Sequence, residues 1–96
     1  MTVKQLLYEK RADIERIAAR HGAYNIRVFG SVVREEEDRD SDIDFVVEVG
    51  KDTSPWFPAG LILDLEDLLG RKVEIVTERA LNQRIKQTIL REAESL

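Results

Sequence analysis

Apolar residues recur every three or four positions over residues 3–18, and charged residues fill most of the positions between them. The apolar set comprises Val3, Leu6, Leu7, Ile14, Ile17 and Ala18. Spacing of this kind gathers the apolar side chains on one face, so it predicts one amphipathic helix. Thr2 is suited to cap the start of this helix, and Gly22 can supply the left-handed residue that often ends one.

Three later segments have the residue content of short β-strands. They are residues 25–29, 43–49 and 71–76. The middle segment is rich in β-branched and aromatic residues, which favour strands. In it Ile43 and Phe45 point one way, whereas Asp44 points the other way, as the two-residue period of a strand requires. The first segment stops at Gly30, where a turn is expected.

Two further stripes of apolar residues predict helices. The first stripe is Leu61, Leu65, Leu68 and Leu69, and the second is Leu81, Ile85, Ile89 and Leu90. Gly70 can close the first of these helices, Ser54 is suited to cap it, and Pro55 is suited to its first turn. The second stripe predicts a helix from about Arg79 to residue 96.

The predicted order of elements is therefore α-β-β-α-β-α, which indicates an α/β (α+β) fold. We expect a single domain over residues 1–96, with a three-stranded mixed sheet flanked by helices. A crossover helix joins the second strand to the third, so these two strands are expected to be parallel.

Charge is concentrated in one segment of the chain. The 96 residues include 15 Lys or Arg and 19 Asp or Glu, a net charge of −4, and residues 34–44 alone carry −5. A chain this acidic is not expected to bind DNA or RNA directly, because affinity for nucleic acid depends on Lys and Arg. A site that meets phosphate through a metal ion remains compatible with this charge.

Other compositional features exclude whole classes of protein. The sequence contains no Cys, which excludes disulfides and thiolate zinc sites. No stretch approaches the roughly 18 apolar residues of a membrane span, so we expect no membrane association and a cytoplasmic location.

The most informative pattern is Gly30-Ser31 followed, after ten residues, by Asp42-Ile43-Asp44. A Gly-Ser pair at the end of a strand exposes backbone N–H groups and a hydroxyl to an anion such as a triphosphate. Asp42 and Asp44 are two residues apart at a strand edge and project to the same side. Their oxygens suit Mg²⁺ better than zinc or copper.

Glu74 extends this pattern, because a carboxylate in the middle of a strand is costly unless something compensates it. If the second and third strands are adjacent, Glu74 approaches Asp42 and Asp44. Three carboxylates can hold one or two divalent ions for phosphoryl or nucleotidyl transfer. Glu74 could alternatively face solvent at a sheet edge, or act as a general base rather than as a ligand.

These residues resemble the signature of the polymerase-beta-like nucleotidyltransferase superfamily, and in particular that of the minimal nucleotidyltransferases, or MntA-type antitoxins, of prokaryotes. The resemblance includes Arg34, three residues after Ser31, and the segment 69–77 around Glu74. It implies that Asp42 and Asp44 bind metal. It also implies that Gly30 and Ser31 contact the triphosphate. Glu74 would be the third carboxylate, in place of the Asp that is common in the superfamily.

The resemblance also implies a reaction and a partner. Family members use Mg²⁺, with two ions expected here, to transfer AMP from ATP to a protein, commonly a tyrosine of a HEPN-domain toxin of the HepT type. The chain would then be the antitoxin of a type VII toxin–antitoxin pair and would form a hetero-oligomer with its toxin. A catalytically idle antitoxin that neutralises its partner by contact alone is the rival interpretation.

Several residues have two or more interpretations. Arg34 could orient a phosphate or pair with acids of residues 35–38. The acidic residues between positions 35 and 40 are expected to lie in a solvated loop and not to bind further metal ions. Trp56 with Phe57 could pack under the following helix, contact a partner or stack on adenine, while Ile89 with Leu90 could dock a partner or form a homodimer. His21 is expected to be a helix-end residue.

Overall fold

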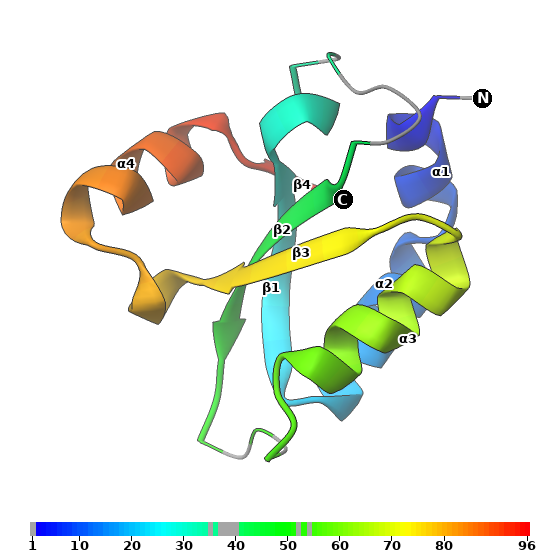
Figure 1. Cartoon of the computed structure of the whole chain (residues 1–96), viewed down its shortest axis with the longest axis horizontal. Helices are drawn as coiled ribbons and strands as arrows, with labels where there is room; N and C mark the ends of the chain where they lie inside the picture. Colours follow the sequence, from blue (N-terminus) through cyan, green and yellow to red (C-terminus); the bar gives the residue numbers. More distant parts are fainter. Residues whose placement is uncertain (1, 35, 37–40, 52, 54) are drawn as a thin grey trace.

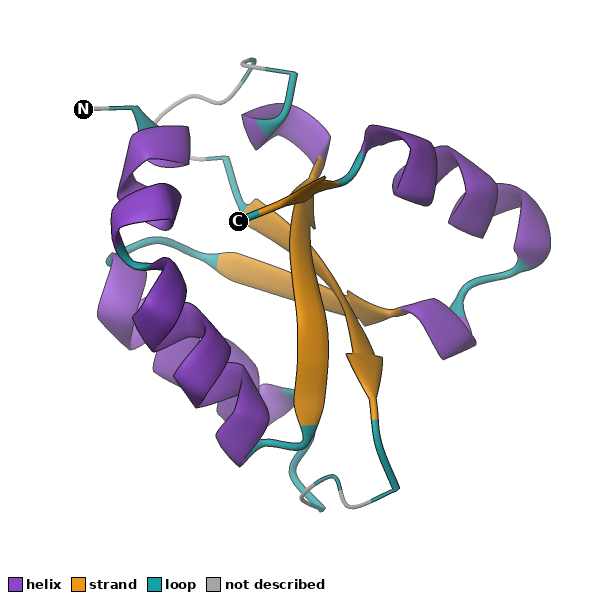
Figure 2. Ribbon diagram, turned by 180° about the vertical axis from the view of Figure 1, so that it is seen from behind, coloured by secondary structure: helices purple, strands orange, loops and turns teal. Residues whose placement is uncertain are grey.

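The structure is a computed structural model that describes residues 2–34, 36, 41–51, 53 and 55–96. Its helices are α1 (Val3–Glu9), α2 (Arg11–Arg20), α3 (Ala59–Leu69) and α4 (Gln83–Glu92), with short 3-10 helices η1 (Gly30–Val32) and η2 (Glu78–Ala80). Its strands are β1 (Ala23–Phe29), β2 (Ile43–Val49), β3 (Val73–Thr77) and β4 (Glu94–Ser95). Helices α1, α2 and α3 cover one face of the sheet, and α4 lies on the other side (Figures 1 and 2).

The single N-terminal helix predicted from the apolar stripe is wrong, because the segment forms two helices that meet at Lys10. The bend allows both Leu7 and Ile14 to bury their side chains almost completely. Arg11 bridges the bend, since its guanidinium donates to the carbonyl of Tyr8 at 2.9 Å and lies 4.0 Å from the centre of that ring. No Gly or Pro marks this bend in the sequence.

The predicted helix ends are mostly confirmed. Thr2 caps α1 through its Oγ1, which accepts from the N–H of Gln5 at 3.1 Å, while Oε1 of Gln5 accepts from the N–H of Thr2 at 2.9 Å. Gly22 follows α2 with φ of 82°, and Gly70 follows α3 with φ of 67°. Both positions therefore need the left-handed conformation that glycine adopts without steric cost.

The start of α3 differs from the prediction. This helix begins at Ala59 rather than near Pro55, and the predicted cap Ser54 lies outside the described residues. Trp56 is 78% exposed, so it does not pack under α3, whereas Phe57 packs against the core. The turn at 55–58 therefore separates these two aromatic side chains.

The sheet has four strands in the order β3-β2-β1-β4, and not the three that were predicted. Strands β2 and β3 are parallel, as the crossover helix indicated, and β1 is antiparallel to β2. The fourth strand arises because α4 ends at Glu92 and does not continue to residue 96. Ala93 is extended, and Glu94–Ser95 pairs with Arg27 and Val28 of β1.

The core lies between the sheet and the helices α1, α2 and α3. Its innermost side chains come from alternate positions of β2 and from the helix stripes: Leu7, Ile14, Ile43, Phe45, Val47, Leu61 and Leu65. The opposite face of β2 carries Asp44, the fully buried Val46 and Glu48. Strand β2 thus has one apolar face, which holds the fold together, and a second face that carries both carboxylates. In the part of the chain that the structure describes, no helix has the length and apolar character needed to cross a membrane.

Candidate active site

Asp44 and Glu74 are direct neighbours across the sheet. Their Cα atoms are partners in the parallel ladder between β2 and β3, and their carboxyl groups are hydrogen-bonded. Asp42 lies one residue before β2 begins, is exposed, and is close enough to Asp44 for its charge to act on it. The second and third strands are adjacent, which was the condition for Glu74 to approach the aspartates, and Glu74 lies beside Asp44.

The carboxyl group of Asp44 has an altered affinity for protons. Its pKa is raised to about 6, chiefly by burial, and further by the hydrogen bond to Glu74 and by the negative charges of Glu74 and Asp42. The charge of Arg34 acts in the opposite direction. Carboxyl groups that repel one another in this way hold a proton up to a higher pH than isolated carboxyl groups do, and a bound cation relieves the repulsion.

Gly30 joins β1 to this cluster. Its φ is +80°, it is buried, and a Cβ atom at this position would collide with the carboxylate of Asp44. The register explains the proximity, because Phe29, the residue before it, is the β1 partner of Asp44. Only glycine fits here without a shift of Asp44, for both steric and conformational reasons.

Ser31 and Arg34 follow Gly30 through the short helix η1. The N–H of Arg34 donates to the carbonyl of Gly30 at 3.2 Å, and the N–H of Glu36 donates to the carbonyl of Ser31 at 2.8 Å. The chain therefore curls back on itself directly beside Asp44. The residues predicted to contact phosphate and the residues predicted to bind metal are brought to one place.

The guanidinium of Arg34 is held by two acids. Its Nε donates to Oε2 of Glu36 at 3.1 Å, and its Nη1 donates to Oε1 of Glu92 in α4. The first of these hydrogen bonds, then the second, raises the pKa of Arg34. The predicted local pairing is present, but the contact with Glu92 was not anticipated, because 58 residues separate the two and no sequence pattern links them.

A second charged group lies farther along the same face of the sheet. Nη2 of Arg27 donates to Oε2 of Glu78 at 2.5 Å, and both side chains are more than four-fifths buried. Lys86 of α4 approaches the same carboxylate at 3.8 Å. Sequence reasoning missed this group, although Arg27 alternates with buried residues in β1, which was a weak signal that it faces away from the core.

The carboxylate oxygens of Asp42, Asp44 and Glu74 are donors that suit Mg²⁺, although they do not form a complete coordination shell. Within the described residues, no set of three or more Asp, Glu, His or Cys side chains is already arranged around a common point for an ion. Mg²⁺ is commonly held by only one or two protein carboxylates, with water and substrate phosphate completing its octahedron. The raised pKa of Asp44 and its closeness to the turn at Gly30 therefore fit an ion that arrives with a nucleotide.

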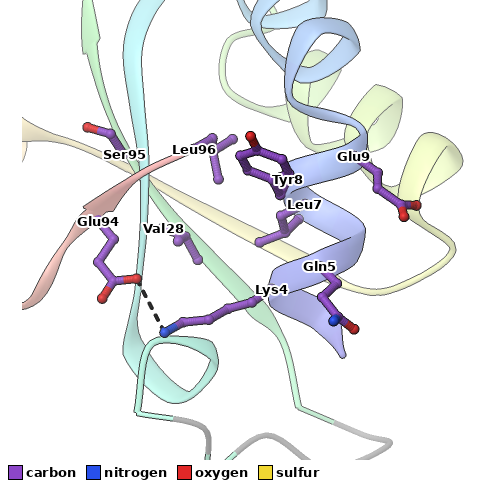
Figure 3. A pocket seen from close by; sticks show the side chains of 9 residues that line it. All are labelled: Lys4, Gln5, Leu7, Tyr8, Glu9, Val28, Glu94, Ser95 and Leu96. Carbon is purple, nitrogen blue, oxygen red and sulfur yellow. Dashed lines mark ion pairs between the residues drawn. The ribbon is translucent and has the colours of Figure 1, made fainter. Parts of the chain in front are cut away.

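Other predicted residues lie elsewhere. His21 caps the end of α2 as expected, and its Nε2 lies 2.7 Å from Oδ2 of Asp64 in α3. Ile89 and Leu90 are half-buried on α4, a helix with no buried residue. A cavity of about 470 Å³ lies between α1 and β4, lined by Tyr8, Leu96 and neighbouring side chains (Figure 3), and Asp42, Asp44 and Glu74 are not among its lining residues. The candidate active site is therefore identified by its chemistry and not by this cavity.

Comparison with known proteins agrees with this geometry. The pattern of the nucleotidyltransferase domain family matches residues 11–96. The protein adenylyltransferase MntA of Thermococcus cleftensis is 35% identical over 92 residues, which cover 96% of this chain and 93% of that relative. A solved structure assigned as a minimal nucleotidyltransferase is 43% identical with a TM-score of 0.86, and the match covers 100% of this chain and 97% of that chain.

A more distant solved structure shares the fold. It contains a tri-AMPylated HEPN toxin of Shewanella oneidensis in complex with an MNT antitoxin, and it matches with 21% identity and a TM-score of 0.67 over 95% of this chain and 69% of that chain. Fold and site together define a nucleotidyltransferase. The chain belongs to the nucleotidyltransferase domain family and is an enzyme of that class.

Proposed function

We propose that this chain transfers AMP from ATP to a tyrosine of a HEPN-domain toxin, and that it acts as the antitoxin of that pair in the cytoplasm. The observation that carries the proposal is the meeting of Asp44 with Glu74 on one side and with Gly30 on the other. That arrangement places candidate metal ligands beside a turn that can receive phosphates. The 35% identical MntA and the toxin complex of Shewanella oneidensis support protein adenylylation and a HEPN partner in a hetero-oligomer.

In the proposed reaction, the acceptor hydroxyl oxygen attacks the α-phosphorus of ATP. A new oxygen–phosphorus bond forms, the bond from the α-phosphorus to the oxygen that bridges to the β-phosphorus breaks, pyrophosphate leaves, and the hydroxyl proton passes to a base, for which Glu74 is a candidate. Asp42, Asp44 and Glu74 would hold Mg²⁺, which would supply charge neutralisation for the triphosphate. Gly30, Ser31 and Arg34 would contact phosphate oxygens through N–H and hydroxyl groups.

Two roles suit Glu74, and one experiment separates them. As a ligand for a second ion, Glu74 would be needed for tight Mg²⁺ binding, so Glu74→Gln would raise the Mg²⁺ concentration needed for half-maximal rate. As the group that accepts the hydroxyl proton, its loss would instead remove the acidic limb of the pH–rate profile at saturating Mg²⁺. Transfer rates at several Mg²⁺ concentrations and pH values distinguish these outcomes.

The function itself is tested by labelling. The chain is incubated with Mg²⁺, ATP labelled at the α-phosphate and a HEPN-domain toxin from the same organism. Native chain is expected to label that protein, whereas Asp42→Asn/Asp44→Asn is not. The control Asp67→Asn/Glu15→Gln removes two charges from α3 and α2, across the sheet from the site, and is expected to label normally.

The rival function, neutralisation by contact alone, predicts a different result. If the native chain adds no label to the partner, yet Asp42→Asn/Asp44→Asn suppresses the toxin in cells as well as the native chain does, the proposal of an active adenylyltransferase is wrong. A toxin that is suppressed only by the native chain and the control variant would support the enzyme.

A further inference from the structure

The nucleotide-side residue Arg34 is attached to an element far along the chain. Its Nη1 donates to Oε1 of Glu92, the last residue of α4, and its Nε donates to Glu36. The two acids differ in exposure, because the side chain of Glu92 is 22% exposed whereas that of Glu36 is 64% exposed. Glu92 is therefore the more restricted partner, and it loses less side-chain freedom on holding the guanidinium.

The backbone of Glu92 is anchored to the same strand that leads into the phosphate turn. Two residues after Glu92, Glu94 pairs with Val28 of β1, and Gly30 follows Val28 by two residues. On the α1 side, Glu94 forms an ion pair with Lys4 at 3.4 Å, which ties β4 to the first helix (Figure 3). The distance between the backbones of Glu92 and the turn is thus set by sheet pairing.

Helix α4 itself contributes little to holding the rest of the fold. None of its residues is buried, although an apolar stripe runs along it. Among the described residues, its side chains form two ion pairs with other elements, Lys86 with Glu78 and Glu92 with Arg34. Since β4 fixes only the end of α4 that carries Glu92, that end is the part best placed to orient a side chain at the site.

The chemistry of the guanidinium leaves room for a ligand. Arginine has five N–H donors in a planar fork, and the contacts with Glu36 and Glu92 engage two of them. The charge of Arg34 also acts on Asp44, which places the guanidinium near the carboxylates. A carboxylate that fixes one edge of such a fork leaves its other donors pointing in a defined direction.

We propose that Glu92 is a positioning residue for Arg34: it holds the guanidinium beside the Gly30–Ser31 turn so that Arg34 can bind a phosphate oxygen of ATP. This inference rests on the proposed function, since it assumes that ATP binds at this turn. Glu92 does not touch the nucleotide in this scheme and acts through Arg34 alone.

Direct binding of ATP tests the role of Glu92. Isothermal titration calorimetry with ATP and Mg²⁺ compares native chain, Glu92→Gln and Glu9→Gln, the last of which removes the same charge from the far side of the sheet. Glu92→Gln is expected to weaken ATP binding roughly three- to ten-fold, whereas Glu9→Gln leaves it unchanged. Glu92→Asp keeps the charge with a shorter reach and is expected to give an intermediate affinity.

A double-mutant comparison separates positioning from a general structural effect. In an Arg34→Met background, Glu92→Gln is expected to cause no further loss of ATP affinity, because there is no guanidinium left to orient. In the transfer reaction, Glu92→Gln is expected to raise KM for ATP while kcat stays within about twofold of native. Tighter or unchanged ATP binding by Glu92→Gln, or an equal loss in the Arg34→Met background, overturns the proposal.

These outcomes are distinct from failure of the proposed function. If the native chain binds ATP and depends on Glu92 as described but transfers no AMP, the positioning role stands and the function is wrong. If AMP is transferred and Glu92→Gln matches native in affinity, only the positioning role is wrong. A native chain that does not bind ATP contradicts both.

Discussion

The α-carbon of Gly30 lies so close to the carboxylate of Asp44 that no side chain fits between them. Gly30 directly follows strand β1 and begins the phosphate turn, and Asp44 lies on the neighbouring strand next to Glu74. The two halves of the candidate active site are therefore in direct contact. A change at either residue is transmitted to the other by steric contact alone.

Gly30→Ala is expected to destabilise the protein by about 1–3 kcal/mol and to reduce transfer strongly, because the added methyl group displaces Asp44 and forces a left-handed φ on alanine. Gly50→Ala is the matched control. Nothing lies within 4 Å of a Cβ built at Gly50, so this variant is expected to keep native stability and activity. Urea unfolding and the labelling assay measure both effects, and equal behaviour of the two variants would contradict the steric argument.

Stability is expected to depend on pH through Asp44. Its pKa in the folded chain is raised to about 6 from an ordinary value of 3.8, so the folded state binds more protons than the unfolded state between these values. The free energy of unfolding therefore falls as pH rises from about 4 to 6. Urea unfolding of native chain and Asp44→Asn over this range, without metal, is expected to show a shallower decline in the variant. If the free energy of unfolding of both proteins changed with pH in the same way, Asp44 would not be the group responsible.

Mg²⁺ is expected to stabilise the folded chain at pH 7, because an ion bound to the carboxylates relieves their repulsion and binds the folded state alone. Tm should rise with Mg²⁺ concentration for the native chain, and more so with ATP present, since phosphate oxygens complete the coordination. Asp42→Asn/Asp44→Asn should show no such rise, whereas Asp67→Asn/Glu15→Gln should behave as native. A rise of equal size in all three proteins would indicate nonspecific binding of the ion.

Glu78→Gln is expected to cost about 1–3 kcal/mol of stability, because it leaves the mostly buried guanidinium of Arg27 with a neutral partner. Glu9→Gln, at an exposed position of α1, provides the comparison and should be nearly neutral. Thermal unfolding measures the difference. If Glu78→Gln is as stable as Glu9→Gln, the ion pair contributes nothing to the fold.

Local patterns in the sequence predicted the parts of the site that depend on local geometry. The two-residue period of β2 turned Asp44 away from the core, and the crossover helix indicated that β2 and β3 are parallel. Their adjacency, which the sequence left as a condition, puts Glu74 beside Asp44. Gly30 was recognisable because a glycine at the end of a strand commonly marks a special backbone conformation. These predictions rely on contacts between neighbouring elements, whose geometry has few alternatives.

The features of the fold and site that the sequence did not predict depend on long-range packing, which no local pattern encodes. The break at Lys10 has no Gly or Pro to mark it and arises because two apolar side chains, Leu7 and Ile14, reach the core from different angles. Strand β4 is only two residues long and exists because β1 offers it an edge. The pairing of Arg34 with Glu92 follows from β4, so it could not be foreseen without it.

The most direct measurement compares two labels in the same reaction. The chain, Mg²⁺ and a HEPN-domain toxin from the same organism are incubated with ATP carrying label at either the α-phosphate or the γ-phosphate, and the label on the toxin is counted. Nucleotidyl transfer at the carboxylate site predicts that label from the α-phosphate becomes attached to the toxin, whereas label from the γ-phosphate leaves with pyrophosphate. Asp44→Asn is expected to abolish both the labelling of the toxin and the release of pyrophosphate. Label retained from the γ-phosphate, or transfer undiminished by Asp44→Asn, would contradict this account.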